Sequence, residues 1–407
     1  MNILELFQNA FIFLLNLLNS FHFFLLLVLI VFLYHLVLFI SRDRNYIKSF
    51  NNEKDPENIG LGDLLSIPIV NIIIPAWKEG EIFRDCLNSI SKLTYPRLKI
   101  IVNAGGDKET IKIASFFKKH NNFIILHQKG GANRPSLGKI KAVNECLDYV
   151  SEGLIYFIDA DSYLNDEILL RIIFPLINSK EKIVGSGVRP LKSQENISLV
   201  KYLFFDRNSN FVFKFSRYSK RVVMAGQNTC VKFEVINSIS KFLEDKKYAT
   251  DKSMAEDMYS KGFKPYRLRD FRSRIFVDFS TKIREFIRQR VIWAENSLFY
   301  SYKYKKLKFL KHLLLLIFSL YILVSPFLIL LNLGFLIIGV IFFLSIYLKK
   351  IRKYLFFKLT TGKEYPIDYN IVFFFKLIYY LLVEAVINII IPFHLFLYYR
   401  SIKKDHE

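Results

Sequence analysis

Two aspartates separated by one residue form the clearest chemical signal in this 407-residue chain. Asp159 and Asp161 follow directly after the apolar run Leu154-Ile-Tyr-Phe-Ile158. If the chain curls into a turn there, both carboxylates can approach one hard cation, which prefers oxygen ligands and keeps room for waters and substrate phosphates. The alternative interpretation is structural, because Asp161 or Ser162 can also cap a following helix. The pair alone leaves both interpretations open.

A second acidic pair and a lysine add to this signal. Glu256 and Asp257 are adjacent, later in the chain, and Gly138-Lys139 precedes a stretch with helical periodicity. We expect Gly138-Lys139 to open that helix, where the backbone amides and the ammonium group would both favour an anion such as phosphate. Each feature taken alone is also compatible with ordinary surface charge.

The elements that must position these residues alternate between short β-branched runs and helical stretches over residues 41–312. The predicted strands are 70–74, 98–102, 123–126, 154–158 and 183–188, and the predicted helices are 81–91, 109–118, 139–150 and 166–177. Such alternation is typical of an α/β fold with a mostly parallel sheet. Ligands of these sheets bind beyond the carboxyl ends of the strands. The first residues after each strand are therefore where we expect the chemistry.

Apolar segments on both sides of this domain predict membrane helices, since 52% of the residues are hydrophobic and 16% are aromatic. Residues 6–40 contain no Asp, Glu, Lys or Arg. We predict an interfacial helix at Ile3–Leu18 and a transmembrane helix at Phe21–Ile40. Three basic residues, Arg42, Arg44 and Lys48, come after this run. Their position disfavours a cleaved signal peptide and predicts an integral protein of the plasma membrane with a cytoplasmic catalytic domain.

The C-terminal region, residues 313–407, is predicted to hold two to four spans or partial spans. Residues 313–348 are free of charge and long enough for two short spans joined near Asn332 and Gly334. Residues 371–399 form either one kinked span or a span followed by a broken piece. Glu384 within that segment either lines a cavity as a functional group or is neutralised by a neighbour.

The charge balance narrows the possible partners. Lysine and arginine number 58 against 36 acidic residues, which gives a net charge of +22. Proteins with such an excess of positive charge bind anionic lipid, a phosphorylated substrate or nucleic acid. Because the basic clusters border the apolar runs, we expect membrane lipids and no nucleic acid. The three cysteines are widely spaced, which predicts buried thiols and neither disulfides nor a zinc site.

Six short motifs, taken in order, resemble those of membrane-bound family 2 glycosyltransferases, a group that includes the cellulose synthase, hyaluronan synthase and ceramide glucosyltransferase types. They are Ile74-Pro-Ala-Trp-Lys-Glu79, Gly138-Lys-Ile-Lys-Ala-Val-Asn144, Asp159-Ala-Asp161, Gly226-Gln-Asn-Thr229, Glu256-Asp257 and Gln289-Arg-Val-Ile-Trp293. The resemblance covers about residues 68–300. It implies a GT-A domain flanked by transmembrane helices, a nucleotide-diphosphate sugar as donor, Mg²⁺ or Mn²⁺ as cofactor, and inversion at the anomeric carbon.

The resemblance also implies roles for individual residues. On the donor side, Pro75, Ala76 and Glu79 would border the nucleoside, and Lys139 would lie near the nucleobase or phosphate. Asp161 would be the main metal ligand, with Asp159 beside the ribose or the metal. Asp257 would be the general base, as a carboxylate that takes the proton of the acceptor hydroxyl. The acceptor side would be formed by Gly226, Gln227, Glu256, Gln289 and Trp293.

Two motifs depart from the family pattern. Where the family has consecutive aspartates after the second strand, this chain has Asn103-Ala-Gly-Gly-Asp107, so the carboxylate that reads uracil is absent or displaced to Asp107. The donor base is therefore open, with a UDP-sugar as one possibility. Ile292 replaces the arginine of the last motif. Arg288 and Arg290 are the candidate substitutes, but a shift of two residues along a helix turns a side chain by about 200° from the original face.

These departures bear on function. We expect a single addition to a lipid or lipid-linked glycan acceptor, because the loss of the arginine weakens the case for processive synthesis. A processive polysaccharide synthase remains an alternative. An inactive membrane scaffold is a further alternative, which the retained acids Asp159, Asp161 and Asp257 disfavour.

Overall fold

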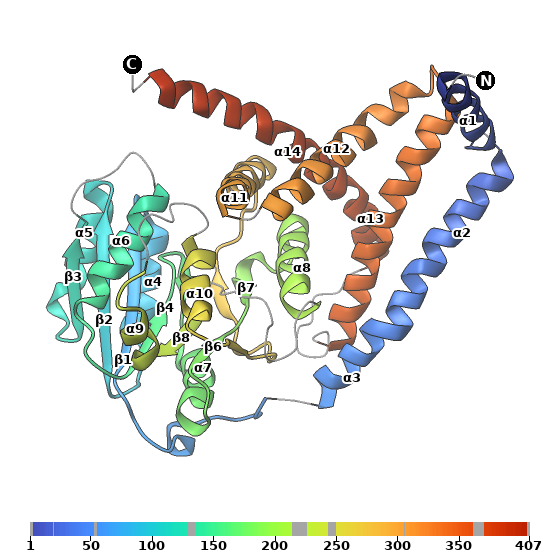
Figure 1. Ribbon diagram of the computed structural model, residues 1–407. Helices are drawn as coiled ribbons and strands as arrows, with labels where there is room; N and C mark the ends of the chain where they lie inside the picture. Colours follow the sequence, from blue (N-terminus) through green and yellow to red (C-terminus); the bar gives the residue numbers. More distant parts are fainter. Residues whose placement is uncertain are drawn as a thin grey trace. The chain divides into compact units, whose positions relative to one another are not determined.

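The structure is a computed structural model that describes residues 3–18, 20–52, 55–128, 135–213, 226–242, 250–304, 306–360 and 370–404 (Figure 1). The chain divides into two compact units. The first, which we call the sheet unit, comprises Phe50–Thr281. The second, the helical unit, comprises Met1–Ser49, Lys282–Gly362 and Pro366–Glu407.

The sheet unit alternates strands with helices along the chain. Its strands are β1 Val70–Trp77, β2 Leu98–Gly105, β3 Phe123–His127, β4 Leu154–Phe157, β5 Ser162–Tyr163, β6 Ile183–Gly185, β7 Val188–Pro190, β8 Thr229–Lys232, β9 Tyr266–Arg267 and β10 Ile275–Val277. Its helices are α4 Glu81–Ser91, α5 Lys108–Phe116, α6 Pro135–Leu147, α7 Asp166–Asn178, α8 Ser198–Phe213, α9 Phe233–Ile239 and α10 Thr250–Ser260. Short 3₁₀ turns lie at η2 Leu61–Asp63, η3 Phe117–Lys119 and η4 Lys192–Gln194.

The large sheet has seven strands in the order β3-β2-β1-β4-β8-β6-β9, and all adjacent pairs are parallel except those of β8. Isoleucines and other apolar residues from its centre pack with α6, α9 and α10 into one buried core. A small sheet has the order β5-β10-β7. The predicted α/β fold with a mostly parallel sheet is confirmed, but the predicted strand 183–188 is divided between the two sheets.

Two helix starts correct the sequence interpretation. The N-cap of α7 is Asn165, whose side chain accepts the backbone N–H of Ile168, so the alternative that Asp161 or Ser162 caps this helix is wrong. Helix α6 begins at Pro135, a residue suited to the first helical position by its fixed φ. The prediction that Gly138-Lys139 opens α6 is therefore wrong by three residues.

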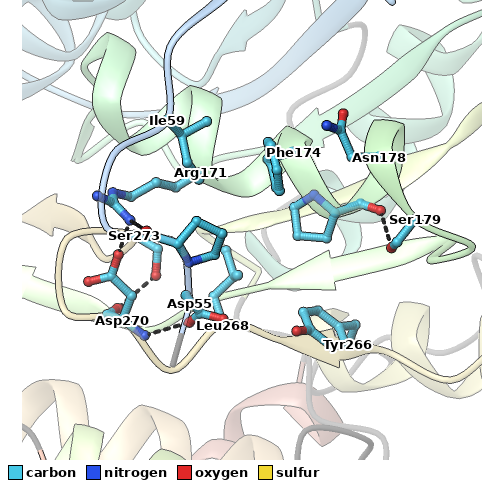
Figure 2. Close-up of a pocket in the computed structure, with 12 residues that line it drawn as sticks. Asp55, Ile59, Arg171, Phe174, Asn178, Ser179, Tyr266, Leu268, Asp270 and Ser273 are labelled. Atoms are coloured by element: carbon cyan, nitrogen blue, oxygen red, sulfur yellow. Dashed lines mark hydrogen bonds and ion pairs between the residues drawn. The ribbon is translucent and has the colours of Figure 1, made fainter. Parts of the chain in front are cut away.

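Side chains connect the segment before β1 to α7 and to the residues between β9 and β10, as Figure 2 shows. The Asp55 carboxylate accepts backbone N–H groups from Arg269 and Asp270, at 2.8 and 2.9 Å. Arg171, which is buried, forms an ion pair with Asp270 and donates to the Pro56 carbonyl at 2.9 Å. A cavity of about 140 Å³ lies here, against the last turns of α7. Helix α7 carries the chain about 20 Å from its N-terminus, so this cavity is remote from the aspartates before α7.

The helical unit contains long apolar helices. They are α1 Ile3–Leu18, α2 Phe21–Leu38 continuing through the π-helical turn η1 Phe39–Asp43 into α3 Arg44–Asn52, α11 Ile283–Tyr304, α12 Lys306–Leu328, α13 Leu333–Thr360 and α14 Ile371–Lys404. Four segments in the described part of the chain are long and apolar enough to cross a membrane, starting at Phe21, Lys306, Leu333 and Ile371. The predicted break near Asn332 is present, and residues 371–399 lie in one helix.

Buried charges link the helices of this unit. Asp43 is fully buried and its carboxylate lies 2.6 Å from Nε of Arg352 on α13. Lys350 on α13 lies 3.6 Å from the Glu384 carboxylate on α14. This ion pair supports the predicted alternative in which a neighbour neutralises Glu384. The three cysteines are free and buried, as predicted.

Candidate active site

The aspartate pair lies where β4 ends in a turn. The backbone N–H of Ile158 still donates to Ile73 of β1, and the N–H of Ser162 donates to the Asp159 carbonyl at 3.1 Å, which closes the turn. Asp161 Oδ1 is buried and, within the part of the chain that the structure describes, has no hydrogen-bond partner. Burial and the nearby charge of Asp159 raise the pKa of Asp161, against the opposing charges of Arg207 and Lys139. A buried carboxylate oxygen without a hydrogen-bond partner is suited to coordinate a cation.

Lys139 connects this turn to two helices. Its Nζ, on α6, lies 2.8 Å from a carboxylate oxygen of Asp159 and 2.8 Å from one of Asp251, at the start of α10. Removal from water alone would lower the pKa of Lys139, but the two carboxylates outweigh it and raise the pKa. The ammonium group therefore stays charged, and it holds the end of β4, α6 and α10 at one point.

Gly226 allows a loop to approach the same point. A Cβ atom on Gly226 would lie 2.1 Å from a carboxylate oxygen of Asp251, so no other residue fits without displacing that aspartate. The next residue, Gln227, is buried and accepts a hydrogen bond from Arg207 of α8. Asn228 accepts a 2.6 Å hydrogen bond from the Tyr156 hydroxyl of β4, which fixes the loop to the sheet.

The ends of β1 and β2 are in close contact, which explains the glycines between β2 and α5. Gly106 has a φ of +94°, and a Cβ there would lie 2.9 Å from the backbone nitrogen of Lys78. Lys78 itself has a φ of 55°, and its N–H donates to the Gly105 carbonyl at 3.1 Å. Gln128 also donates to the Ala76 and Asn103 carbonyls. Side chains at 105 and 106 would separate the two strand ends.

Asp107 has a structural partner in this arrangement. It is the N-cap of α5 and accepts the backbone N–H of Thr110 at 2.8 Å, a hydrogen bond that lowers the pKa of Asp107. The side chain is exposed. Capping therefore accounts for this aspartate, and its predicted contact with a nucleobase remains a prediction. Pro75 and Ala76 lie near the end of β1, where they pair with β2, and the Ala76 side chain is fully buried.

Glu79 faces the aspartate pair. Its backbone exchanges two 2.8 Å hydrogen bonds with the hydroxyl of Thr110, which fixes it beside α5. Burial raises the pKa of Glu79 to about 7, and the charges of Asp161 and Asp159 add to the effect. The three carboxylates therefore form a region of negative potential in which a proton or another cation is favoured.

The residues fit a divalent cation without enclosing it. No group of three or more His, Cys, Asp or Glu side chains forms a metal cage among the described residues. Asp159 and Asp161 fit an ion such as Mg²⁺ that completes its oxygen shell with waters and substrate phosphates. The unpartnered oxygen of Asp161 is the observation that supports this fit.

The predicted base and acceptor residues are more dispersed. Glu256 and Asp257 lie on α10, the helix whose first turn carries Asp251, and the Asp257 side chain is buried while Glu256 is partly exposed. Gln289 and Trp293 lie on α11, in the helical unit. Trp293 is exposed. All of these assignments remain predictions.

Sequence reasoning missed two residues of this site. Asp251 lies five residues before Glu256 in the sequence, and only its contact with Lys139 distinguishes it from surface charge. Arg207 lies in α8, outside every motif, and only its hydrogen bond with Gln227 and its charge near Asp161 reveal it.

Comparison with known proteins identifies the domain that builds this site. Residues 71–240 match the family profile Glycosyl transferase family 2. The chain carries a family 2 glycosyltransferase domain. The matched residues run from β1 to the end of α9, so the family 2 domain includes the aspartate pair, Lys139 and the loop at Gly226. The fold is accordingly GT-A-like.

The curated relatives of the family 2 domain are distant. Glycosyltransferase AglE of Haloferax volcanii is 26% identical over 181 residues, which cover 44% of this chain and 57% of that protein. Probable glycosyltransferase YdaM of Bacillus subtilis is 24% identical over 299 residues, 70% of this chain and 66% of that protein. The match thus spans less than two thirds of either relative. A solved structure, mannosyltransferase PcManGT from Pyrobaculum calidifontis in complex with GDP-Man and Mn²⁺, aligns with a TM-score of 0.48 and 15% identity, covering 68% of this chain and 74% of that one.

The raised pKa of Glu79 predicts a pH-dependent stability. Between the ordinary value of 4.5 and the folded value of about 7 the unfolded chain loses its proton first, so stability falls as pH rises through this window. Glu79→Gln removes the charge. In metal-free protein we expect the variant to be more stable than wild type by roughly 2 kcal/mol at pH 8, with little difference at pH 4.5.

Thermal unfolding of purified protein in chelator, followed by intrinsic fluorescence, measures this difference. Glu81→Gln, a change at an exposed glutamate two residues away, is the matched control. A wild-type protein that melts at or above the temperature of Glu79→Gln at pH 8 would contradict the prediction.

Proposed function

We propose that this protein transfers a sugar from a nucleotide-diphosphate sugar to a lipid or lipid-linked glycan acceptor at the cytoplasmic face of a membrane. One observation carries the proposal. Lys139 lies between Asp159 and Asp251, beside the unpartnered oxygen of Asp161, at the carboxyl edge of the sheet of a family 2 domain. An ammonium group and a carboxylate that would bind the cation thus lie close together, as the departure of a diphosphate would require.

The donor would lie over the ends of β1 and β4. Pro75, Ala76 and Glu79 would border the nucleoside, with Asp107 nearby at the start of α5. Lys139 would turn its ammonium group toward the phosphates, since a phosphate can replace one of its carboxylate partners as a counter-ion. The glycines at 105 and 106 carry no side chain that could contact a nucleobase, so they specify neither the base nor the sugar of the donor.

The cation would be Mg²⁺ or Mn²⁺, held by Asp161 and Asp159. Bound there, it would offset the negative charge that develops on the leaving diphosphate. The two aspartates come from one turn, so the closed backbone between Asp159 and Ser162 keeps both carboxylates at the same edge. Glu79 would favour the same cation through its field rather than as a ligand.

Asp257 would act as the general base. As the acceptor oxygen bonds to the anomeric carbon, the bond from that carbon to the phosphate oxygen breaks, and the acceptor proton passes to the Asp257 carboxylate. Attack from the face opposite the leaving group inverts the anomeric configuration. Gly226, Gln227 and Glu256 would lie on the acceptor side, and Gln289 and Trp293 would belong to it from α11.

The acceptor class follows from the membrane helices and the last motif. The four candidate spans supply a surface at which a lipid-linked hydroxyl can be presented. Ile292 stands where the processive enzymes of the resemblance have an arginine, which favours one addition per acceptor. The basic residues after the first span favour a cytoplasmic site in the plasma membrane.

Asp161→Asn tests the cation site. Asparagine keeps the size of the side chain but removes the charge that balances a divalent ion, so we expect donor turnover to fall by at least about 10²-fold. The assay is release of nucleoside diphosphate by protein in membranes, with and without chelator. Asp148→Asn, at an exposed aspartate paired with Lys241, is the control and should leave turnover unchanged. Full activity of Asp161→Asn, or of wild type in chelator, would remove the cation from the proposal.

Asp257→Asn tests the base. We expect donor binding to be nearly unchanged and transfer to fall by about 10² to 10⁴, the usual contribution of a positioned proton acceptor. Neighbouring helical residues point in different directions, so Glu256→Gln is the matched comparison and should be milder. If Glu256→Gln is the more damaging change, the base is misassigned by one residue. If neither change affects transfer in folded, donor-bound protein, the proposed mechanism fails.

A further inference from the structure

A leaving diphosphate needs more positive charge than the last motif of this chain supplies. The resemblance expects an arginine at residue 292 that reaches the diphosphate, but the residue is isoleucine, exposed on α11. Transfer releases a diphosphate that gains one negative charge when the bond to the anomeric carbon breaks. In a site with limited water this charge requires a nearby cation.

Arg207 is an arginine that α8 brings to this site from outside the motifs. Its guanidinium donates to the Gln227 side chain, in the loop whose Gly226 touches Asp251. Lys139 reaches the same aspartate from α6. Arg207 and Lys139 therefore lie at the two ends of one short chain of contacts, and the positive charges of both lower the pKa of Asp161. All of these residues lie in the sheet unit, so the arrangement does not depend on α11.

The environment of Arg207 suits a fixed phosphate contact. The hydrogen bond to buried Gln227 holds one edge of the guanidinium, and its carbon lies 5.9 Å from the centre of the Phe279 ring. A guanidinium presents its five N–H groups in a rigid fork, which matches two phosphate oxygens at once. Lys139, in contrast, is a point charge already shared by two carboxylates.

We propose that Arg207 binds the diphosphate of the donor and stabilises it as the leaving group, in place of the arginine that Ile292 replaces. The inference rests on the proposed nucleotide-sugar transfer. Bond formation by the acceptor oxygen and loss of its proton to Asp257 are unchanged. The electron pair of the broken bond goes to the outer phosphate, where Arg207 and Lys139 supply positive charge from two sides.

Nucleotide affinity tests the role of Arg207 without any acceptor. Purified full-length protein is titrated by calorimetry, in saturating Mg²⁺, with UDP, GDP, ADP, CDP and dTDP, and then with the monophosphate of each diphosphate that binds. A phosphate contact acts on the outer phosphate, so we expect Arg207→Gln to weaken the diphosphate about 10- to 100-fold and the monophosphate less than threefold. Arg207→Lys should fall between, because it keeps the charge and loses the fork.

The controls separate this inference from the proposed function. Arg84→Gln, at an exposed arginine paired with Glu81, should leave both affinities unchanged. If wild type binds none of the diphosphates, nucleotide-sugar transfer itself fails, and the role of Arg207 with it. If wild type binds one and Arg207→Gln binds it equally well, only the role of Arg207 is overturned. Equal weakening of mono- and diphosphate also overturns it. Should Arg207→Gln not fold, the comparison of Arg207→Lys with wild type decides.

Discussion

The ion pairs of Lys139 with Asp159 and Asp251 are the interaction on which the site depends. The three charges come from a strand end and two helices, and each is partly removed from water. Loss of any one would leave a partner uncompensated, which costs far more in such surroundings than at an exposed surface. Because Asp251 also fills the space beside Gly226, the same contact sets how closely the loop at Gln227 approaches. The cluster thus fixes both the turn that carries Asp159 and Asp161 and the residues around it.

Much of the fold could be predicted because its signals are local. The first four β-branched runs correspond to β1 to β4 of the structure. Helix α4 begins and ends at the predicted residues. Helix α1 Ile3–Leu18 also has its predicted bounds, while its place at a membrane interface stays a prediction. The short strands β5, β8, β9 and β10 were missed. With two to four residues each, they are too short for a period of two to show, and pairing with distant strands creates them.

The candidate site was predictable to the extent that its residues sit at strand ends. Asp159 and Asp161 lie in a turn after β4, as the aspartate spacing suggests. Arg207 and Asp251 were not predictable, because arginine and aspartate on helices are ordinary surface residues until distant contacts are known. Asp107 shows the reverse case. The sequence assigns this aspartate to a ligand, whereas in the structure it is the N-cap of α5 and accepts the backbone N–H of Thr110. An aspartate can cap a helix or contact a ligand, and the sequence alone does not distinguish these two roles.

The central claim is that the Lys139 cluster is a nucleotide-sugar site, and donor consumption tests it most directly. Full-length protein in membranes is incubated with a panel of nucleotide sugars and Mg²⁺ or Mn²⁺, and released nucleoside diphosphate is measured. We predict that one donor is consumed, that Lys139→Met reduces its consumption by at least about 10²-fold, and that Lys118→Met, at an exposed lysine, does not. A Lys139→Met protein as active as wild type, or a wild-type protein that consumes no donor of the panel, would contradict the claim.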